Sequence, residues 1–477
     1  MRASRSRGGA SGDRRLSTGI HALDQILRGG LPPYSVVAVA GLPGAGKTTL
    51  AQQILFANAR AGNTGVYLTT FSESPMKAAR YQSGFSFFDA AQFGESVIYM
   101  DIGQTIRKEG LAQALDVIAE ALRDLQPQIV VVDSFKAIHD LAPSSQEMRT
   151  FIYDLAIELS AMQATTLLVG EYTENDLATL PELAIADGIV WLYSELRNDQ
   201  QMRFLRVLKL RGVDYLTGAY NFSIGKGGIE IYTLDDEMVA DSVLRGEPIS
   251  TGSHALDALL HGGIPRGTPT LVTGAAGTGK STFALQYIYR GAADSGEPAL
   301  YVTYEETPEQ LIANAERFGW DLRPLIARGL LHIEYTPLAN VNPNEQAQRI
   351  RARIRELGIR RAVIDSLTML LQQFDRPDVM RQYVYRLVSI FRNAGCTALL
   401  ISDPQIGSDT VSRFGVEESI VDGVIILRLT RGAEQRLRQR TLEIYKMRGV
   451  AHAMGEHTMR ISGQGLQVFP RIEEAVR

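Results

Sequence analysis

Two stretches of this sequence have the residue pattern of a loop that holds phosphate groups. Residues 41–48 and 274–281 each match G-x-x-x-x-G-K-[ST], and each follows an apolar run and precedes a helix-like stretch, 49–59 or 282–289. The glycines of such a loop let backbone N–H groups approach a β-phosphate, and the helix N-terminus favours the anion. Because the pattern occurs twice in the strand–loop–helix context that separates a P-loop from a glycine-rich turn, the sequence predicts two sites for ATP.

The residues that close each loop have separate expected roles. Lys47 and Lys280 are expected to reach the β- and γ-phosphates and to act in catalysis, and Thr48 and Ser281 are expected to ligate Mg²⁺. The loop residues predicted to contact the nucleotide are Gly44, Ala45, Gly46, Lys47, Thr48 and Thr49 in the first copy and Gly277, Thr278, Gly279, Lys280, Ser281 and Thr282 in the second.

An apolar run that ends in aspartate lies downstream of each P-loop. Residues 129–133 end at Asp133, and residues 362–365 end at Asp365. An aspartate at a strand end is more often a turn or cap residue when it stands alone. With a P-loop upstream, the pattern favours a Walker B residue that acts on Mg²⁺ through water.

Hydrolysis or phosphoryl transfer also needs a group that orients the nucleophile. Glu305 and Glu306 follow the apolar run 299–303 and are therefore expected at a strand end, where α/β sheets place ligands; Glu305 is also a candidate metal ligand. The aligned positions of the first copy hold Ser72 and Glu73. Since a serine cannot accept a proton as a carboxylate does, the first copy is expected to hydrolyse ATP slowly unless Glu73 substitutes. The alternative for the glutamate pair is a solvated helix cap.

These candidate sites belong to a repeat that runs through the chain. Lys47 and Lys280 stand 233 residues apart, and four other segments recur in the same order at separations between 232 and 237 residues. The recurring segments are 16–24 with 249–257, 132–134 with 364–366, 187–190 with 422–425, and 209–212 with 446–449. Such collinear matches indicate a tandem duplication.

Short apolar runs alternate with longer mixed stretches within each copy. In the first copy the runs are 36–40, 66–69, 129–132, 166–169 and 189–193. Because they are rich in Val, Ile and Leu with little alternation, they are typical of strands buried on both faces. The sequence therefore predicts an α/β fold with two tandem RecA-like P-loop NTPase domains, each a mainly parallel sheet covered by helices on both faces. We expect a disordered basic tail at 1–15 and domains at 16–238 and 239–477.

The composition restricts the partners. The chain has 477 residues, of which 45% are hydrophobic and 21% charged, and its formal net charge is -4. This balance weakens functions that need a strongly basic surface for nucleic acid. The single cysteine, Cys396, excludes an intrachain disulfide and fits a cytoplasmic, reducing compartment. No apolar run approaches the length of a membrane span.

Taken together, the two P-loops, the strand-end aspartates, the segment around Glu305 and the paired segments 209–212 and 446–449 resemble the KaiC family. The resemblance covers about residues 14–470. It implies a double-ring homo-oligomer, a hexamer, with ATP and Mg²⁺ between subunits. It also implies slow ATPase activity, and autokinase and autophosphatase activity in the second ring.

The resemblance also implies roles for residues outside the P-loops. Two cationic segments would reach the γ-phosphate on the neighbouring subunit, where a cation in trans stabilises developing charge. They are Lys209, Leu210 and Arg211 in the first ring and Lys446, Met447 and Arg448 in the second. Arg440 matches a further nucleotide contact, and Phe318 matches an aromatic residue near the adenine. The alternative for the cationic segments is a strand edge with solvated charges.

The family carries an adjacent Ser-Thr pair before a strand of its second domain, and here that position holds Glu418-Ser419. Ser419 is therefore the predicted phosphoacceptor, and Glu418 carries a fixed negative charge in place of the other. The aligned positions in the first copy, Leu183 and Ala184, have no hydroxyl. The alternative for Ser419 is an ordinary serine at a helix end or in a loop.

Three functions follow, in order of preference: an ATPase with serine autokinase and autophosphatase activity, an ATP-gated oligomeric signalling scaffold, and a RecA-type DNA-dependent ATPase. The resemblance implies a KaiB-like protein partner. A KaiA-type partner recruited by a C-terminal tail is not expected, because the chain ends at Arg477, soon after the last predicted strand. Neither a membrane nor nucleic acid is an expected partner.

Overall fold

The computed structural model describes residues 15–70, 75–197, 200–233, 246–405, 410–431 and 438–471. Two compact units divide the chain, one from Met1 to Thr233 and the other from Leu234 to Arg477. The predicted tail, apart from its last residue, the predicted domain boundary at 238/239 and the predicted residues Ser72 and Glu73 lie outside the described residues.

The first unit is built on a sheet that has nine strands among the residues described. The strands are β1 (Val36–Gly41), β2 (Gly65–Thr69), β3 (Val97–Asp101), β4 (Ile129–Asp133), β5 (Thr165–Glu171), β6 (Gly188–Arg197), β7 (Gln200–Leu210), β8 (Tyr220–Gly225) and β9 (Gly228–Ile231). Their order is β3-β2-β4-β5-β1-β6-β7-β8-β9. The strands from β3 to β6 are parallel, and β6 to β9 form antiparallel hairpins.

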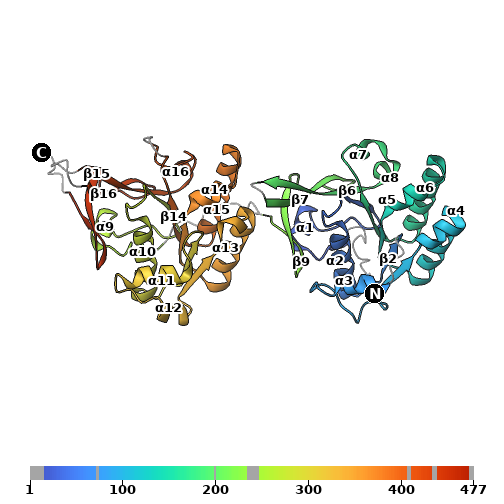
Figure 1. The fold of residues 1–477 in the computed structure, drawn as a ribbon, viewed down its shortest axis with the longest axis horizontal. Coiled ribbons are helices and arrows are strands. Elements are labelled where there is room, and N and C mark those ends of the chain that lie inside the picture. Colours follow the sequence, from blue (N-terminus) through green and yellow to red (C-terminus); the bar gives the residue numbers. More distant parts are fainter. Residues whose placement is uncertain are drawn as a thin grey trace, which may run out of the picture. The chain divides into compact units, whose positions relative to one another are not determined.

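Helices cover both faces of this sheet (Figure 1). They are α1 (His21–Ile26), α2 (Lys47–Arg60), α3 (Pro75–Gln82), α4 (Gly103–Leu125), α5 (Phe135–Leu141), α6 (Ser145–Ala161), α7 (Asp176–Thr179) and α8 (Pro181–Ile185). Alternate residues of β4 enter different cores: Val131 packs in the cluster that contains α1 and α2, and Val130 packs in the cluster that contains α4 and α6. This explains why the strand reads as a continuous apolar run.

The second unit repeats the arrangement (Figure 1). Its strands are β10 (Pro269–Gly274), β11 (Ala299–Thr303), β12 (Leu331–Tyr335), β13 (Arg361–Asp365), β14 (Thr397–Ser402), β15 (Gly423–Arg431), β16 (Arg438–Met447), β17 (Glu456–Ser462) and β18 (Gly465–Phe469), in the order β12-β11-β13-β14-β10-β15-β16-β17-β18. Its helices are α9 (His254–Leu259), α10 (Lys280–Asp294), α11 (Pro308–Glu316), α12 (Arg323–Ala327), α13 (Pro343–Leu357), α14 (Leu367–Leu371), α15 (Pro377–Asn393) and α16 (Glu417–Ile420), with a 3-10 turn at Leu338–Asn340. The two sheets confirm the predicted fold class.

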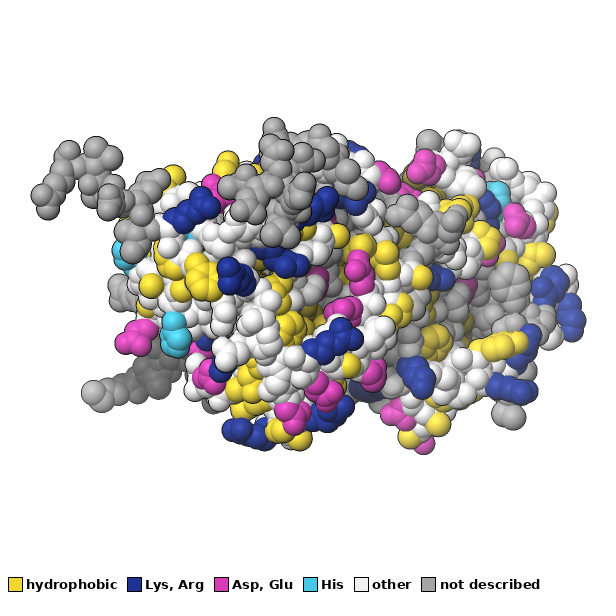
Figure 2. All heavy atoms as spheres, turned by 60° about the vertical axis from the view of Figure 1, so that its left-hand side comes forward, with side chains coloured by type: hydrophobic (Ala, Val, Ile, Leu, Met, Phe, Trp, Pro, Cys, Tyr) yellow, Lys and Arg dark blue, Asp and Glu magenta, His cyan; other side chains and the backbone are white. Residues whose placement is uncertain are grey.

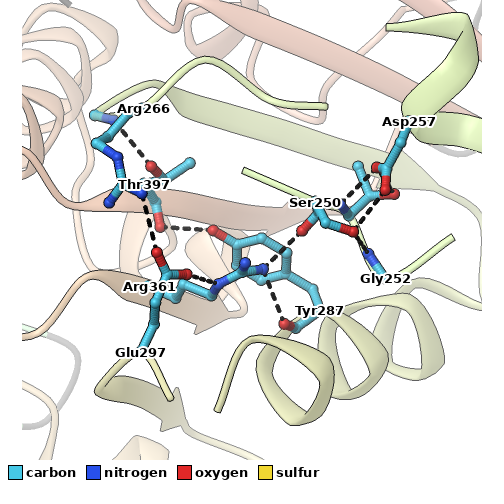
Figure 3. A network of polar contacts seen from close by, with 10 residues as sticks. Ser250, Gly252, Asp257, Arg266, Tyr287, Glu297, Arg361 and Thr397 are labelled. Atoms are coloured by element: carbon cyan, nitrogen blue, oxygen red, sulfur yellow. Dashed lines mark hydrogen bonds and ion pairs between the residues drawn. The ribbon is translucent and has the colours of Figure 1, made fainter. Parts of the chain in front are cut away.

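A buried polar network distinguishes the second unit (Figure 3). Arg361, the first residue of β13, is 2% exposed and donates to Glu297 at 2.6 Å and to the Ser250 carbonyl at 2.7 Å. Arg266 holds the other oxygen of Glu297 at 3.1 Å, and the Tyr287 ring lies 4.8 Å from the Arg361 guanidinium. Both charges of this buried pair are therefore satisfied, as burial of a charge requires.

The surface has no strongly one-signed character on the face that Figure 2 shows, where lysine and arginine side chains lie among aspartate and glutamate side chains. Within the described ranges, no helix combines the length and the apolar character that crossing a membrane would need.

Candidate nucleotide-binding sites

Each predicted P-loop connects the central strand of its sheet to a helix. In the first unit β1 leads into α2, and in the second β10 leads into α10. Gly46 and Gly279 are the N-caps of these helices, with φ of 102° and 111°, in the left-handed region that glycine adopts without strain. The free N–H groups of the first helical turn therefore face the loop, which is the arrangement that binds a phosphate.

The two loop lysines turn back onto their loops. The Lys47 amine donates to the Leu42 carbonyl at 2.8 Å, and the Lys280 amine donates to the Gly274 carbonyl at 2.5 Å. Burial lowers the pKa of Lys47, while the negative charges of Glu171 and Asp133 oppose that fall. Each amine is thus already held at its loop, where a polyphosphate would replace a carbonyl as its partner.

The predicted Walker B aspartates lie beside the loop hydroxyls. Asp133, at the end of β4, accepts from Thr48 at 2.7 Å and from the Tyr67 hydroxyl at 2.6 Å. Burial raises the pKa of Asp133, and these two hydrogen bonds oppose the rise. In the second unit Asp365 accepts from Tyr301 at 2.7 Å, and burial likewise raises its pKa against hydrogen bonds from Tyr301 and Ser281. Hydroxyl and carboxylate oxygens meet in both units, as a divalent cation site requires.

A further acidic residue lies at each site, and the sequence patterns did not reveal it. Glu171 ends β5, paired in register with Gly41, and Asp403 directly follows β14. The Asp403 carboxylate lies 3.0 Å from the Lys280 amine. Both acids stand at the end of the strand next to the P-loop strand, and their separation of 232 residues is the only sequence signal that could have found them.

The glutamate pair of the second unit stands at the same edge of the sheet. Glu305 follows β11, whose last residue, Thr303, is in register with Asp365. Burial, together with the negative charges of Asp365 and Asp403, raises the pKa of Glu305. Burial also raises the pKa of Glu306, which accepts from Asn314 at 3.0 Å. The cap of the next helix is supplied by Thr307 instead, so neither glutamate is needed as a helix cap.

A cavity of about 660 Å³ opens beside the first P-loop. Its lining contains Gly46, Lys47 and Thr48, and it also contains Asp133 and Glu171. The P-loop, the Thr48 side chain and the two acidic residues therefore all line the same cavity. Tyr67, Phe85 and Tyr99 also line that space.

In each sheet the P-loop lies at one end of the strands and the cationic segment lies at the other end. We call these two sides of the sheet the P-loop edge and the cationic edge. Lys446 is in register with Val424, near the start of β15, whereas the P-loop residue Gly274 is in register with Leu427. Three residues of strand, about 10 Å, separate these positions. The Lys446 amine turns further away, donating to the Val421 carbonyl at 2.7 Å. The chain therefore does not bring Lys446 to its own P-loop.

The first unit has the same separation. Lys209 is in register with Ile189, and Gly41 with Leu192. Lys209 donates to the Ala184 carbonyl at 3.0 Å, and Arg211 donates to the same atom at 3.3 Å. In both units the cations face the segment before β6 or β15, so neither P-loop is met by the cationic segment of its own unit.

Comparison with known proteins identifies the family. The KaiC ATPase family matches residues 16–236 and 249–473. The chain belongs to the KaiC ATPase family. It is similar to the circadian clock oscillator protein KaiC of Parathermosynechococcus lividus, with 38% identity over 247 residues, 50% of this chain and 45% of that protein. It is also similar to the protein of that name from Synechococcus elongatus, with 38% identity over 227 residues, 45% of this chain and 42% of that protein. Each match spans less than half the length of the relative.

Membership of the KaiC ATPase family implies that the chain binds nucleotide, and other predicted contacts can be placed on that basis. Arg440 donates from two guanidinium nitrogens to the Gly277 carbonyl at 3.2 Å, so it contacts the P-loop of its own chain. Leu210 and Met447 are buried in the hydrophobic cores, and only their backbone could meet a nucleotide. Phe318 stacks on Trp320 at 4.8 Å and lines a second hollow, with Gln286 and other residues of α10 and the β17–β18 turn.

The predicted phosphoacceptor lies among cations of this KaiC-type domain. The Ser419 hydroxyl donates to the Val416 carbonyl at 2.9 Å and accepts from Arg381 at 3.2 Å. Arg448 donates to the Ser419 carbonyl at 3.1 Å, and the Lys446 amine donates to the Glu418 carbonyl at 2.9 Å. Ser419 is therefore placed at the cationic edge of the second sheet, with one arginine already on its hydroxyl.

Proposed function

We propose that this chain is a ring-forming, Mg²⁺-dependent ATPase whose second domain transfers a phosphoryl group from ATP to Ser419 of a neighbouring subunit and removes it again. The observation that carries the proposal is the placement of two half-sites at opposite edges of one sheet. One edge holds Lys280, Asp365 and Glu305, and the other holds Ser419 with Lys446. A closed ring brings the two edges together, because every subunit then meets its neighbour through unlike surfaces.

The residues at the P-loop edge would hold the nucleotide. Lys280 and the free N–H groups of α10 would bind the phosphates, and Ser281 with Asp365 would hold Mg²⁺. The bound ATP would supply the γ-phosphoryl group. Glu305 would accept the proton from the attacking hydroxyl, since its carboxylate stands at the same strand edge and burial raises the pKa of Glu305 above that of an ordinary glutamate.

The residues at the cationic edge would complete the reaction. Lys446 and Arg448 would stabilise the charge that develops on the transferred group. Arg381, already on the Ser419 hydroxyl, would pair with the phosphate of the product. In transfer, the Ser419 Oγ–phosphorus bond forms as the bond to ADP breaks. Water in place of Ser419 gives hydrolysis.

The first unit has the same phosphate-binding loop without an acceptor hydroxyl, because Ala184 occupies the position aligned with Ser419. We propose that this domain binds ATP and contributes mainly to assembly of the ring. A hexameric ring and a KaiB-like partner are predictions that rest on the resemblance alone.

Mass spectrometry with peptide mapping, after incubation of the purified chain with Mg²⁺ and ATP, tests the transfer. We expect one phosphate on Ser419, absent in Glu305→Gln and in Ser419→Ala. ATP consumption without phosphate on Ser419 would instead leave a ring ATPase that serves as a nucleotide-gated scaffold.

Mixing of subunits tests whether the cations act in trans. The Lys280→Ala and Lys446→Ala variants are each expected to lose nearly all activity of the second domain, both ATP turnover and Ser419 phosphorylation, when assayed alone. In an equal mixture, about a quarter of the interfaces combine an intact P-loop with an intact cation, so activity returns to about a quarter of wild type. Failure of the mixture to recover activity, with subunit exchange shown by native mass spectrometry, would contradict action in trans.

A further inference from the structure

We propose that a buried chain of hydroxyl groups ending at Glu417 couples the second P-loop of a subunit to the acceptor segment and cations on the opposite edge of the same subunit. The inference rests on the proposed function, because it assigns a role to nucleotide binding at one interface in preparing the next interface around the ring.

The chain of contacts begins at the P-loop lysine. The Lys280 amine lies 3.0 Å from the Asp403 carboxylate. The backbone N–H of Asp403 donates to the Thr368 hydroxyl at 2.9 Å, and that hydroxyl lies 3.1 Å from the Ser402 hydroxyl. Both Thr368 and Ser402 are fully buried. A group that contacts the phosphates is thus joined to two hydroxyls inside the protein.

Glu417 receives the other end of this chain. Ser402 donates to one carboxylate oxygen of Glu417 at 3.3 Å, and the backbone N–H of Val416 donates to the other at 3.1 Å. The Ser412 hydroxyl lies 2.6 Å from that same oxygen and 2.5 Å from the Glu418 carboxylate, so it donates to one of the two at a time. Because Glu417 has no exposed surface, losing a donor leaves a buried acceptor unsatisfied.

Glu417 is also the first residue of α16, the four-residue helix that carries Ser419. Further contacts of α16 come from the cationic edge and from α15: Lys446 on the Glu418 carbonyl, Arg448 on the Ser419 carbonyl, and Arg392 on the Ile420 carbonyl at 3.2 Å. A helix this short is positioned by such contacts more than by its own hydrogen bonds. A displacement at Glu417 therefore reaches Ser419 and both cations.

Nucleotide binding supplies the displacement. Phosphate groups compete with Asp403 for the Lys280 amine, so the ion pair is expected in the empty site and weakened in the occupied one. Because the two states differ in the contacts of Asp403, the ligand has a differential interaction with them and can shift the equilibrium. The hydroxyl chain runs from the backbone of Asp403, which gives the shift a physical path to α16.

The first unit lacks these hydroxyls and provides an internal control. Lys136 and Gly170 occupy the positions aligned with Thr368 and Ser402. The corresponding buried glutamate, Glu182, accepts from the Tyr172 hydroxyl at 3.4 Å. A Cβ at Gly170 would overlap the Tyr172 ring, so a serine could not stand there without moving that ring. The coupling is therefore expected in the second unit and not in the first.

Hydrogen–deuterium exchange of the full chain tests the coupling without requiring kinase activity. Exchange in peptides covering residues 410–421 would be compared with and without Mg²⁺ and a non-hydrolysable ATP analogue. We expect the analogue to slow exchange at least about threefold in wild type and by much less in Glu417→Gln and Ser402→Ala. Analogue affinity, measured by calorimetry, should stay within about twofold of wild type in both variants.

Two matched controls accompany the variants. Glu182→Gln makes the same change in the first unit, and Ser389→Ala removes a hydroxyl of α15 that is outside the chain; both should keep the full response. If Glu417→Gln fails to fold, Ser402→Ala decides, because it removes one hydroxyl and leaves Glu417 with its other donors. An unchanged response in Ser402→Ala, or no response in wild type, would overturn the proposal.

Phosphate on Ser419, measured in the same proteins, separates this inference from the proposed function. In Glu417→Gln and Ser402→Ala, phosphorylation of Ser419 should fall at least about fivefold more than ATP consumption falls. A wild type that shows the exchange response but no phosphate would contradict the kinase and leave the coupling standing. A wild type that is phosphorylated but shows no exchange response would do the reverse.

Discussion

Each copy has a phosphate-binding loop of the same pattern, but the polar contacts of the loop lysine differ between the two copies. In the first, Lys47 contacts the Leu42 carbonyl of its own loop; in the second, Lys280 also meets Asp403, which leads into the buried hydroxyls and Glu417. Duplication has preserved the parts that any nucleotide site needs. The differences lie in the polar contacts that connect this site to the rest of the domain.

The buried residues of the two units also differ, and the additional polar contact is again in the second unit. Arg361 begins β13 and is held by Glu297, whereas the aligned position in β4 is Ile129, buried in an apolar core. An apolar residue fills space without specifying a partner, while a buried ion pair tolerates few arrangements. We therefore expect the second unit to have the more narrowly determined geometry, which suits the acceptor role proposed for Ser419.

The largest effect should come from the loop lysines. Lys280→Ala should lower ATP turnover at the second site by roughly 10³-fold and remove phosphate from Ser419, because it deletes the charge that stabilises the transferred group. Lys47→Ala should mainly weaken assembly of the ring. Phosphate release and native mass spectrometry measure the two outcomes. Loss of most turnover in Lys47→Ala would reverse the assignment of the faster domain.

A smaller effect is expected from the buried ion pair. Arg361→Ile should lower the free energy of unfolding of the second unit by about 2 kcal/mol, since Glu297 loses one charged donor and keeps Arg266. The first unit has Ile129 and Asn63 at the positions of Arg361 and Glu297, so the double variant Arg361→Ile, Glu297→Asn reproduces its residues and should recover part of that loss. Denaturant unfolding would measure both, and a more stable single variant would contradict the ion pair's role.

The smallest effect concerns pH. A general base works in its deprotonated form. The pKa of Glu305 is raised by burial and by the negative charges of Asp365 and Asp403. As the medium is acidified, activity should therefore begin to fall at a higher pH than it would with an ordinary glutamate as the base. Asp403→Asn removes one of the charges that raise this pKa. The acidic limb of the rate profile should therefore move to lower pH. A limb that stays in place would indicate that another group limits the rate.

The sequence was sufficient for features that depend on a fixed local spacing. The P-loops and the strand-end aspartates Asp133 and Asp365 all belong to short motifs, and the five predicted runs of the first copy correspond to β1, β2, β4, β5 and β6. β3 was not among them; it lies at the end of the strand order, and Val97 is the one fully buried residue of its five. The alternation of side chains along a strand explains Leu210 and Met447, because the residues beside two outward cations point inward.

Features that depend on several distant segments could not be predicted. Ser402 and Asp403 lie at the end of β14, Thr368 lies in the helix that follows β13, and no motif joins them to Glu417. Only the folded sheet, by placing β14 between β13 and β10, brings these segments together. The roles proposed for the site residues follow from this geometry and remain predictions.

The placement of the P-loop and the cations at opposite edges of a sheet also has a consequence for mixed populations. Under the proposed action in trans, a subunit that carries both Lys280→Ala and Lys446→Ala inactivates its own site and the site that it would complete for its neighbour. The fraction of intact sites then falls as the square of the fraction of normal chains, so a small proportion of defective chains inactivates about twice its share of sites. The steepness of inhibition against the fraction of defective chains would show how many neighbours each subunit serves.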